Sequence, residues 1–294
     1  MPVVDIPDAS GKHLRLLEFN GKLYPNFPAE VITNIKSLKL REDDVIISAY
    51  PKSGTHWLFE ICRMLLAGRT DLEVISKVDF MIELMEQDIL DQAKSPRVLN
   101  SHVAFSDLPT DLAVKKPKII YIRRNPKDVA VSFYNHCYRI SELYDYRGEF
   151  KDFIELFING KVEYNCWYKQ VLDWEKVIDN NMEYSILHLT YEDLKADPIV
   201  EIRKISDFLQ VKRNEELIEE ICGLCSFSKM EKRKGHILAD ENGKSKIYRK
   251  GEVGDWKNWF TVAQSERFDR IYRERMVGSK LKFRYSLEDE DCTK

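Results

Sequence analysis

The sequence predicts an α/β fold, a three-layer sandwich in which a central, mainly parallel sheet lies between layers of helices. Short runs of β-branched residues alternate with helical segments along the 294 residues, which is typical of parallel strands joined by crossover helices. The run over residues 118–123 is apolar through its middle, as expected for a strand buried on both faces. No linker or internal repeat stands out. We therefore expect one domain over residues 1–294, with flexible ends at about 1–20 and 286–294.

The first half of the chain contains three expected strands. The first covers residues 45–50 and leads through a loop at 51–55 into a helix at 56–66, whose apolar residues lie close to one face. A weaker strand is expected at 97–101, followed by the buried strand at 118–123. Asn125 and Pro126 then form a typical helix start, an N-cap followed by proline at the first helical position. This helix is expected to run to about residue 136.

The second half continues the alternation of strands and helices. A fourth strand is expected at 184–189, and further helices are expected at 198–209, 215–224 and 265–276. Residues 229–254 are rich in Lys, Arg and Gly, which predicts a mobile basic loop. The acidic tail at 288–291 predicts disorder.

The composition argues against several classes of protein. A hydrophobic fraction of 44% with 32% charged residues indicates a globular chain, and a net charge of −3 gives no general reason to bind nucleic acid. No window approaches the roughly 18 apolar residues that span a bilayer, and the first ten residues lack the apolar region of a secretory signal. We therefore expect a cytoplasmic protein with no membrane and no nucleic-acid partner.

The six cysteines are dispersed along the chain, which is typical of a reducing compartment. Cys222 and Cys225 have the CxxC spacing, but no second pair and no suitably spaced histidine completes a zinc set. We favour buried thiols over a redox or metal role, and we expect no bound metal.

The loop after the first strand has the chemistry of an anion site. Gly54 lets the backbone approach an anion closely, and the following helix N-terminus offers unpaired N–H groups. Lys52 adds a charge, while Ser53 and Thr55 add hydroxyl donors. The lysine precedes the glycine and no Ser or Thr takes the Mg²⁺-binding position, so the order differs from GxxxxGK[ST]. The loop indicates a relative of the P-loop nucleotide-binding folds whose phosphate site needs no metal; the alternative is an ordinary turn with a solvated lysine.

A second anion site is expected where the buried strand ends. This strand delivers Arg124 to its carboxyl end, and Ser132 follows eight residues later on the next helix. The two side chains can reach one ligand if the chain reverses at Asn125 and Pro126. A guanidinium group binds phosphate oxygens in pairs, so the combination suits a terminal phosphate. A surface arginine cluster is the alternative.

Together these segments resemble the cytosolic sulfotransferases. Residues 50–57 (YPKSGTHW) resemble the family's 5′-phosphosulfate loop, and the segment from Arg124 to Ser132 resembles its 3′-phosphate site. Residues 249–251 (RKG) resemble the C-terminal cofactor segment, and Lys257–Glu266 fits the KxxxTVxxxE dimer-contact pattern. The resemblance covers nearly the whole chain. It implies a homodimeric enzyme that transfers a sulfonyl group from 3′-phosphoadenosine 5′-phosphosulfate (PAPS) to the hydroxyl group of a small acceptor.

The resemblance also implies the roles of individual residues. His102, at the end of the sequence RVLNSH, is the expected base that removes the acceptor proton, and Lys52 is expected to stabilise charge on the leaving phosphate. Ser132 is expected to contact Lys52 when no acceptor is bound. Trp57 and Phe227 are expected on the two faces of the adenine. The residues expected to hold PAPS are Lys52, Ser53, Gly54, Thr55, His56, Trp57, Arg124, Ser132, Tyr191, Phe227, Arg249, Lys250 and Gly251.

Two positions depart from the family pattern. Asn100 stands where the family has the lysine of Lys-Thr-His, so Lys52 is expected to carry more of the positive charge near the sulfonyl group. Cys225 replaces a threonine that contacts the adenine, which weakens a hydrogen bond there. All histidines other than His102 and His56 are expected to have structural or incidental roles.

The acceptor is the least constrained part of the prediction. We expect it to be bound by loops at 78–91, 138–150 and 236–248. Apolar and aromatic residues favour a flat acceptor such as a phenol: Phe80, Met81, Leu84, Phe105, Tyr138, Tyr144, Tyr146 and Tyr248. A phenolic amine would instead need a carboxylate, for which the candidates are Glu142, Asp145 and Glu149. Catecholamines, steroids and aliphatic alcohols stay open.

Three other functions share part of these features. A nucleotide kinase shares the strand, loop and helix, but it needs a metal-binding Ser or Thr that the loop lacks. A PAPS-binding protein without activity is suggested by Asn100 and opposed by His102. A Golgi carbohydrate sulfotransferase would need a membrane anchor, for which the sequence offers no candidate.

Overall fold

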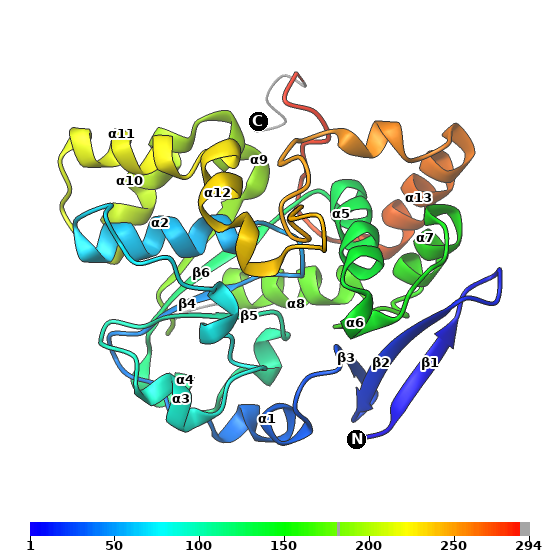
Figure 1. The fold of residues 1–294 in the computed structure, drawn as a ribbon, viewed down its shortest axis with the longest axis horizontal. Helices are drawn as coiled ribbons and strands as arrows, with labels where there is room; N and C mark the ends of the chain where they lie inside the picture. The colour runs from blue at the N-terminus through cyan, green and yellow to red at the C-terminus, as the bar shows by residue number, and fades with distance from the viewer. Residues whose placement is uncertain (181–182, 289–294) are drawn as a thin grey trace.

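The computed structural model describes residues 1–180 and 183–288. Its central sheet is fully parallel, with the strand order β5-β4-β6-β7 (Figure 1). These strands are Val45–Ser48 (β4), Val98–Ser101 (β5), Lys118–Arg123 (β6) and Ile186–Thr190 (β7). The predicted α/β class is confirmed. The strand at 118–123 is observed as predicted, and the other three differ by one or two residues at their ends.

Helices cover both faces of this sheet and complete a three-layer sandwich. Successive side chains of a strand point to opposite faces, so Ile47 and Ile120 pack into one layer and Ile46 and Tyr121 into the other. The first layer contains α2 (Thr55–Ala67), α10 (Pro198–Leu209) and α11 (Glu215–Leu224). The second layer contains α1 (Ala29–Asn34), α3 (Gln87–Asp91), α4 (Leu112–Lys115) and α8 (Trp167–Asp179). In Figure 1, α2, α10 and α11 lie above the strands, and α1, α3 and α4 lie below them.

The remaining helices lie beside the sheet and around its carboxyl edge. They are α5 (Pro126–Arg139), α6 (Ser141–Tyr144), α7 (Phe150–Ile158), α9 (Tyr191–Ala196), α12 (Phe227–Lys234) and α13 (Val262–Arg275). Short 3₁₀ turns are η1 (Ile35–Ser37), η2 (Lys77–Phe80), η3 (Phe105–Asp107), η4 (Gly235–Leu238) and η5 (Asp255–Asn258). The predicted start of α5 is confirmed, because the Asn125 side chain accepts a hydrogen bond from the N–H of Asp128 at 2.9 Å.

The stretch at 229–254 differs from the predicted mobile loop. Its first residues continue α12, in which Met230 and Lys234 are buried. Lys234 pairs with the buried Glu60 of α2 at 2.5 Å, and Met230 joins the core of the first layer. The basic residues that suggested a solvated loop therefore include one that holds α12 against α2.

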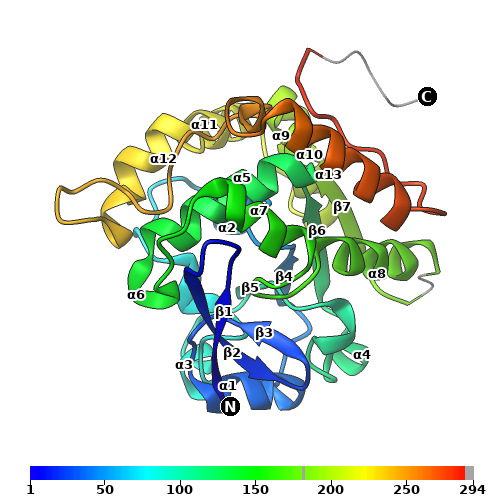
Figure 2. The same cartoon turned by 90° about the vertical axis from the view of Figure 1, so that its right-hand side faces the viewer.

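The first 20 residues also differ from expectation. They form most of a second, antiparallel sheet of β1 (Val3–Pro7), β2 (His13–Phe19) and β3 (Lys22–Tyr24). Leu14 and Leu16 are fully buried against the core around α5 and α7, which explains why this segment is ordered. This sheet lies at the right-hand edge of the molecule in Figure 1 and faces the viewer in the lower half of Figure 2, apart from the central sheet. The acidic tail predicted to be disordered lies almost entirely outside the described residues.

The parallel sheet brings four predicted site residues to one edge. Lys52 follows β4, His102 follows β5, Arg124 follows β6 and Tyr191 follows β7. Because the carboxyl ends of parallel strands meet at the same edge, ligands of such sheets bind there. Within the described part of the chain, no helix is long and apolar enough to cross a membrane.

Candidate active site

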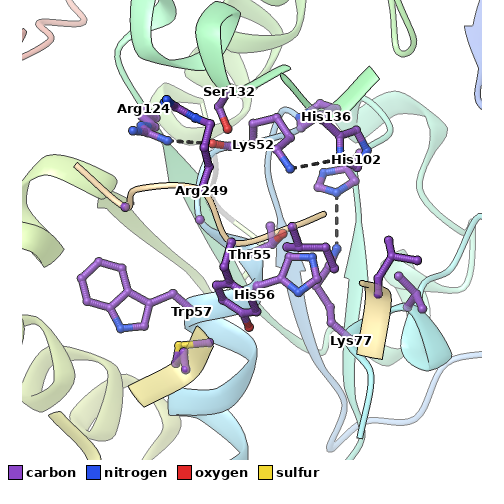
Figure 3. A pocket seen from close by; sticks show the side chains of 18 of the residues that line it. Lys52, Thr55, His56, Trp57, Lys77, His102, Arg124, Ser132, His136 and Arg249 are labelled. Atoms are coloured by element: carbon purple, nitrogen blue, oxygen red, sulfur yellow. Dashed lines mark hydrogen bonds between the residues drawn. The ribbon is translucent and has the colours of Figure 1, made fainter. Parts of the chain in front are cut away.

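A cavity of about 570 Å³ opens at this edge of the sheet (Figure 3). Most of the residues predicted to bind PAPS or act on it line the cavity: Lys52, Gly54, Thr55, His56, Trp57, His102, Arg124, Ser132, Tyr191, Phe227, Arg249, Lys250 and Gly251. Ser53 belongs to the same loop, but it is buried and does not line the cavity. The three acceptor loops all contribute to the lining, through residues such as Met81, Leu143 and Ile247.

The loop between β4 and α2 is tightly turned. Gly54 has φ of +111°, and a Cβ atom there would lie 2.9 Å from the Tyr191 ring, so this close approach requires glycine. Lys52 has φ of +70°, which is unfavourable for a residue with a side chain. Non-glycine residues in this conformation concentrate at functional sites, where the surrounding structure holds them. The turn directs the N-terminus of α2 toward the cavity.

Arg124 connects the loop to two other parts of the site. Its Nη1 donates to the carbonyl of Lys52 at 3.3 Å, and its Nη2 donates to the carbonyl of Glu252 at 2.7 Å. The guanidinium carbon lies 4.0 Å from the centre of the Tyr191 ring. Arg124 thus fixes the loop, the segment at residue 252 and the end of β7 relative to each other.

Arg249 and Lys250 reach the cavity from the C-terminal segment, and both pair with Asp255 at 2.6 Å. Burial would raise the pKa of Asp255, but hydrogen bonds from Lys250, Asn258 and Arg249 lower it to about 2. Asp255 therefore stays ionised and fixes the two basic side chains.

His102 is held at the end of β5 by four contacts. Its backbone N–H donates to Glu83 at 2.6 Å, and its carbonyl accepts from Gln170 at 2.6 Å. The ring Nδ1 lies 2.8 Å from the carbonyl of Ala49, and Nε2 lies 3.4 Å from Nζ of Lys77. A carbonyl only accepts hydrogen bonds, so Nδ1 carries the proton and Nε2 of the neutral ring carries the lone pair. Burial, and next the charge of Lys77, hold the pKa of His102 well below its usual value.

Lys52 begins a chain of polar contacts along the cavity wall. Its Nζ lies 3.3 Å from Nδ1 of His136, whose Nε2 lies 3.1 Å from the hydroxyl of Tyr144. That hydroxyl donates to Glu163 at 2.5 Å. The expected contact of Ser132 with Lys52 is not the one observed, since His136 takes this place.

Three residues at the site were not predicted from the sequence. Lys77 and Glu163 line the cavity without belonging to any motif, and His136 had been expected to be incidental. Each is brought to the site by the fold: Lys77 by η2, Glu163 by the loop before α8, and His136 by the last turn of α5. For His136 alone the sequence held a signal, because it lies four residues, about one helical turn, after Ser132.

Of the residues expected to favour a phenol, Phe80, Phe105, Tyr138 and Tyr146 do not line the cavity. Phe80 packs against Phe59 in the core, and Phe105 packs against Trp174. Tyr138 is 44% exposed and lies beside Arg147. Met81, Leu84, Tyr144 and Tyr248 do line the cavity. The cavity therefore contains part of the expected acceptor set, while Phe80 and Phe105 are used for packing.

The residues at the loop and at Arg124 fit an anionic nucleotide such as PAPS. Two residues that line the cavity have buried donors without a protein partner, Trp57 at Nε1 and Arg124 at Nε. Gly54 itself packs against the Tyr191 ring, which holds the loop close to the end of β7. Among residues 1–180 and 183–288, no group of three or more His, Cys, Asp or Glu side chains is arranged to hold a metal ion.

Comparison with known proteins identifies the family. Residues 42–280 match the sulfotransferase domain. Mouse sulfotransferase 1A1 is 38% identical over 275 residues, which cover 88% of this chain and 93% of that protein. Human sulfotransferase 1C2 is 36% identical over 291 residues, covering 93% of this chain and 96% of that protein. The crystal structure of mouse sulfotransferase SULT7A1 complexed with PAP superposes with a TM-score of 0.75 at 32% identity, covering 90% of this chain and 95% of that one.

The chain therefore belongs to the sulfotransferase family. It is a PAPS-dependent sulfotransferase, an enzyme that transfers a sulfonyl group to the hydroxyl group of an acceptor.

Proposed function

We propose that this sulfotransferase acts on small phenols, with His102 as the base and Lys52 as the cation at the leaving phosphate. The observation that carries the proposal is that Nε2 of His102 and the ammonium group of Lys52 line one cavity, whose remaining wall is mostly apolar and aromatic. When bound, PAPS supplies the activated sulfonyl group.

His102 is suited to take the proton of the acceptor hydroxyl. The bond from Nδ1 to the carbonyl of Ala49 fixes the ring orientation and places the lone pair on Nε2, which lies 3.4 Å from Nζ of Lys77. Because its pKa lies well below the usual value, the ring is neutral at neutral pH. A neutral imidazole within reach of the hydroxyl group is what a general base requires.

Lys52 is suited to stabilise developing negative charge. Burial lowers the pKa of its ammonium group to about 8, with Glu163 opposing the shift, so it remains mostly charged at pH 7. Its hydrogen-bond partner is the neutral His136, which leaves the ammonium free to donate to a phosphate oxygen. We assign the phosphosulfate end to the residues of 52–57, and the 3′-phosphate end to Arg124, Ser132 and the segment at 249–251.

The apolar and aromatic part of the cavity wall favours an aromatic acceptor. It is formed by Pro25, Phe27, Val78, Met81, Leu84, Ile140, Leu143, Tyr144, Tyr164, Leu238, Ile247 and Tyr248. This surface gives a flat ring extensive apolar contact with few hydrogen-bond demands.

The carboxylates first considered for an amine point elsewhere. Glu142 pairs with Lys246, Asp145 with Arg15 at 3.3 Å, and Glu149 with Lys151 at 3.0 Å. Glu163 is a carboxyl group that lines the cavity, but burial raises its pKa to about 8. It is mostly uncharged at pH 7 and attracts an ammonium group weakly, so we favour neutral phenols over phenolic amines.

We further propose that the chain works in the cytoplasm as one domain and as a homodimer through Lys257–Glu266. The five cysteines that the structure describes are free thiols, which suits a reducing compartment. Within the dimer segment Val262 is 76% exposed, which is unusual for an apolar side chain and suits a contact surface.

A panel of acceptors with radiolabelled PAPS tests the substrate class. Simple phenols should give the highest kcat/KM, catecholamines less and hydroxysteroids least. Turnover of hydroxysteroids or aliphatic alcohols with no turnover of phenols would overturn the phenol assignment while leaving sulfonyl transfer intact.

A further inference from the structure

Lys77 is a buried lysine aimed at the catalytic histidine. It begins η2, is only 3% exposed and lines the cavity. Its Nζ donates to Oδ1 of Asn100 at 2.6 Å and lies 3.4 Å from Nε2 of His102 (Figure 3). Both of these neighbours are uncharged, and burial lowers the pKa of Lys77 to about 7, with the nearby Glu83 opposing the shift. An anion bound in the cavity would therefore favour the charged form of Lys77. The position therefore suits a cation that acts on a ligand.

Asn100 holds Lys77 in this position. Its Nδ2 donates to the carbonyl of Lys77 at 2.8 Å and to the carbonyl of Phe80 at 3.0 Å. Its own backbone carbonyl accepts from the N–H of Ile82 at 3.0 Å. These bonds fasten η2 to β5. A lysine side chain at position 100 has no acceptor and could not receive the ammonium group of Lys77.

We propose that Lys77 supplies the positive charge at the transferring sulfonyl group, with Asn100 as the residue that positions it. The inference rests on the proposed roles of His102 and Lys52. Lys77 donates hydrogen bonds to the sulfonyl oxygens and keeps its own protons, while the new oxygen–sulfur bond forms and the bond from sulfur to the phosphate oxygen breaks. The proton of the acceptor goes to Nε2 of His102.

The same charge acts on His102. After burial, the charge of Lys77 is the largest influence that lowers the pKa of this histidine, and Lys52 adds to it. The other titratable groups around the ring are Lys52, His56, His136, Glu83 and Tyr164. They remain when Lys77 is replaced, so the pKa of His102 should rise toward its usual value in such a variant.

Three variants test the proposal: Lys77→Gln, Lys77→Met and the double variant Lys77→Gln with Asn100→Lys. The turnover is measured with labelled PAPS and a phenol, PAP binding by calorimetry, and the His102 titration by NMR without PAPS. Lys77→Gln should lower kcat by about tenfold or more, keep the Kd for PAP within about twofold, and raise the pKa of His102 by about 0.5 or more. The double variant should recover most of the lost turnover, because it returns a cation to the same neighbourhood.

Several results would overturn the role of Lys77. They are wild-type kcat in Lys77→Gln, an unshifted His102 titration, or a loss of turnover that Asn100→Lys does not restore. If Lys77→Gln does not fold, kcat and the His102 titration are measured on Lys77→Met instead. A wild-type enzyme that sulfonates no phenol would instead contradict the proposed function, so the two failures are distinguishable.

Discussion

Nζ of Lys52 lies 3.3 Å from Nδ1 of His136, and through Tyr144 this contact leads to the buried carboxyl group of Glu163. One end of this chain is the proposed leaving-group cation, and the other end lies in the wall of the acceptor cavity. The two ends shift in opposite directions from their usual pKa values, because burial disfavours the charged form of each.

Replacing Lys52 tests the charge at the leaving phosphate. We expect Lys52→Met to lower kcat by about a hundredfold or more, since it removes a donor aimed at charge that develops in the transition state. Lys232→Met is the matched control, because Lys232 is an exposed lysine of α12. Initial rates at saturating PAPS check both variants. Equal kcat for Lys52→Met and Lys232→Met would remove Lys52 from the mechanism.

Glu163 should make stability depend on pH. Its pKa is raised from 4.5 to about 8, chiefly by burial, so the folded state loses stability as the pH rises through this range. Glu163→Gln has no proton to lose. From pH 5 to pH 8, the free energy of unfolding should therefore fall more in the wild type than in Glu163→Gln, by about 1 kcal/mol or more. Urea unfolding of both proteins at the two pH values measures this difference. The same pH dependence in both proteins would show that Glu163 ionises at little cost in folding stability.

Gly251 tests the packing of the cofactor segment. It has φ of +67°, and a Cβ atom there would lie 2.3 Å from the ring of Phe227. Gly251→Ala should displace Phe227 and weaken PAP binding by about tenfold or more, which corresponds to about 1.4 kcal/mol. Gly243→Ala is the control, since Gly243 has a similar φ of +76° but open space around it. Calorimetry should show weaker PAP binding for Gly251→Ala alone; similar Kd values for both variants would argue against a role of Phe227 in binding.

Val262 tests the proposed dimer contact. Val262→Glu places a charge within Lys257–Glu266 and should shift the protein toward monomers in sedimentation experiments, because an unpaired charge is costly to bury. Val277→Glu changes an equally exposed valine, at 80% exposure, outside this segment. It should leave the dimer intact. A dimer that tolerates Val262→Glu would place the contact elsewhere.

The sequence predicted those parts of the structure that depend on local patterns. The strands around Ile47 and Ile120, the cap at Asn125 and the loop at Lys52 each carry their signal within a few residues. The residues that we propose for phosphate binding could be placed at one site for the same reason, because they lie directly after strands whose carboxyl ends meet at one edge.

The parts that were missed depend on tertiary structure. Lys77 reaches His102 only because η2 folds onto β5. None of the residues next to Lys77 in the sequence marks it as part of a site. Phe105 looked like an acceptor contact because the sequence does not distinguish an aromatic ring in a cavity from one that packs against Trp174.

The most direct test of the account is the transfer of labelled sulfonyl from PAPS to 4-nitrophenol by the wild type and by His102→Gln, in the presence of EDTA. The account predicts full wild-type activity in EDTA, a loss of about a hundredfold or more in kcat for His102→Gln, and the same PAP affinity for both proteins. Wild-type turnover by His102→Gln, with PAP binding intact, would contradict the assignment of His102 as the base.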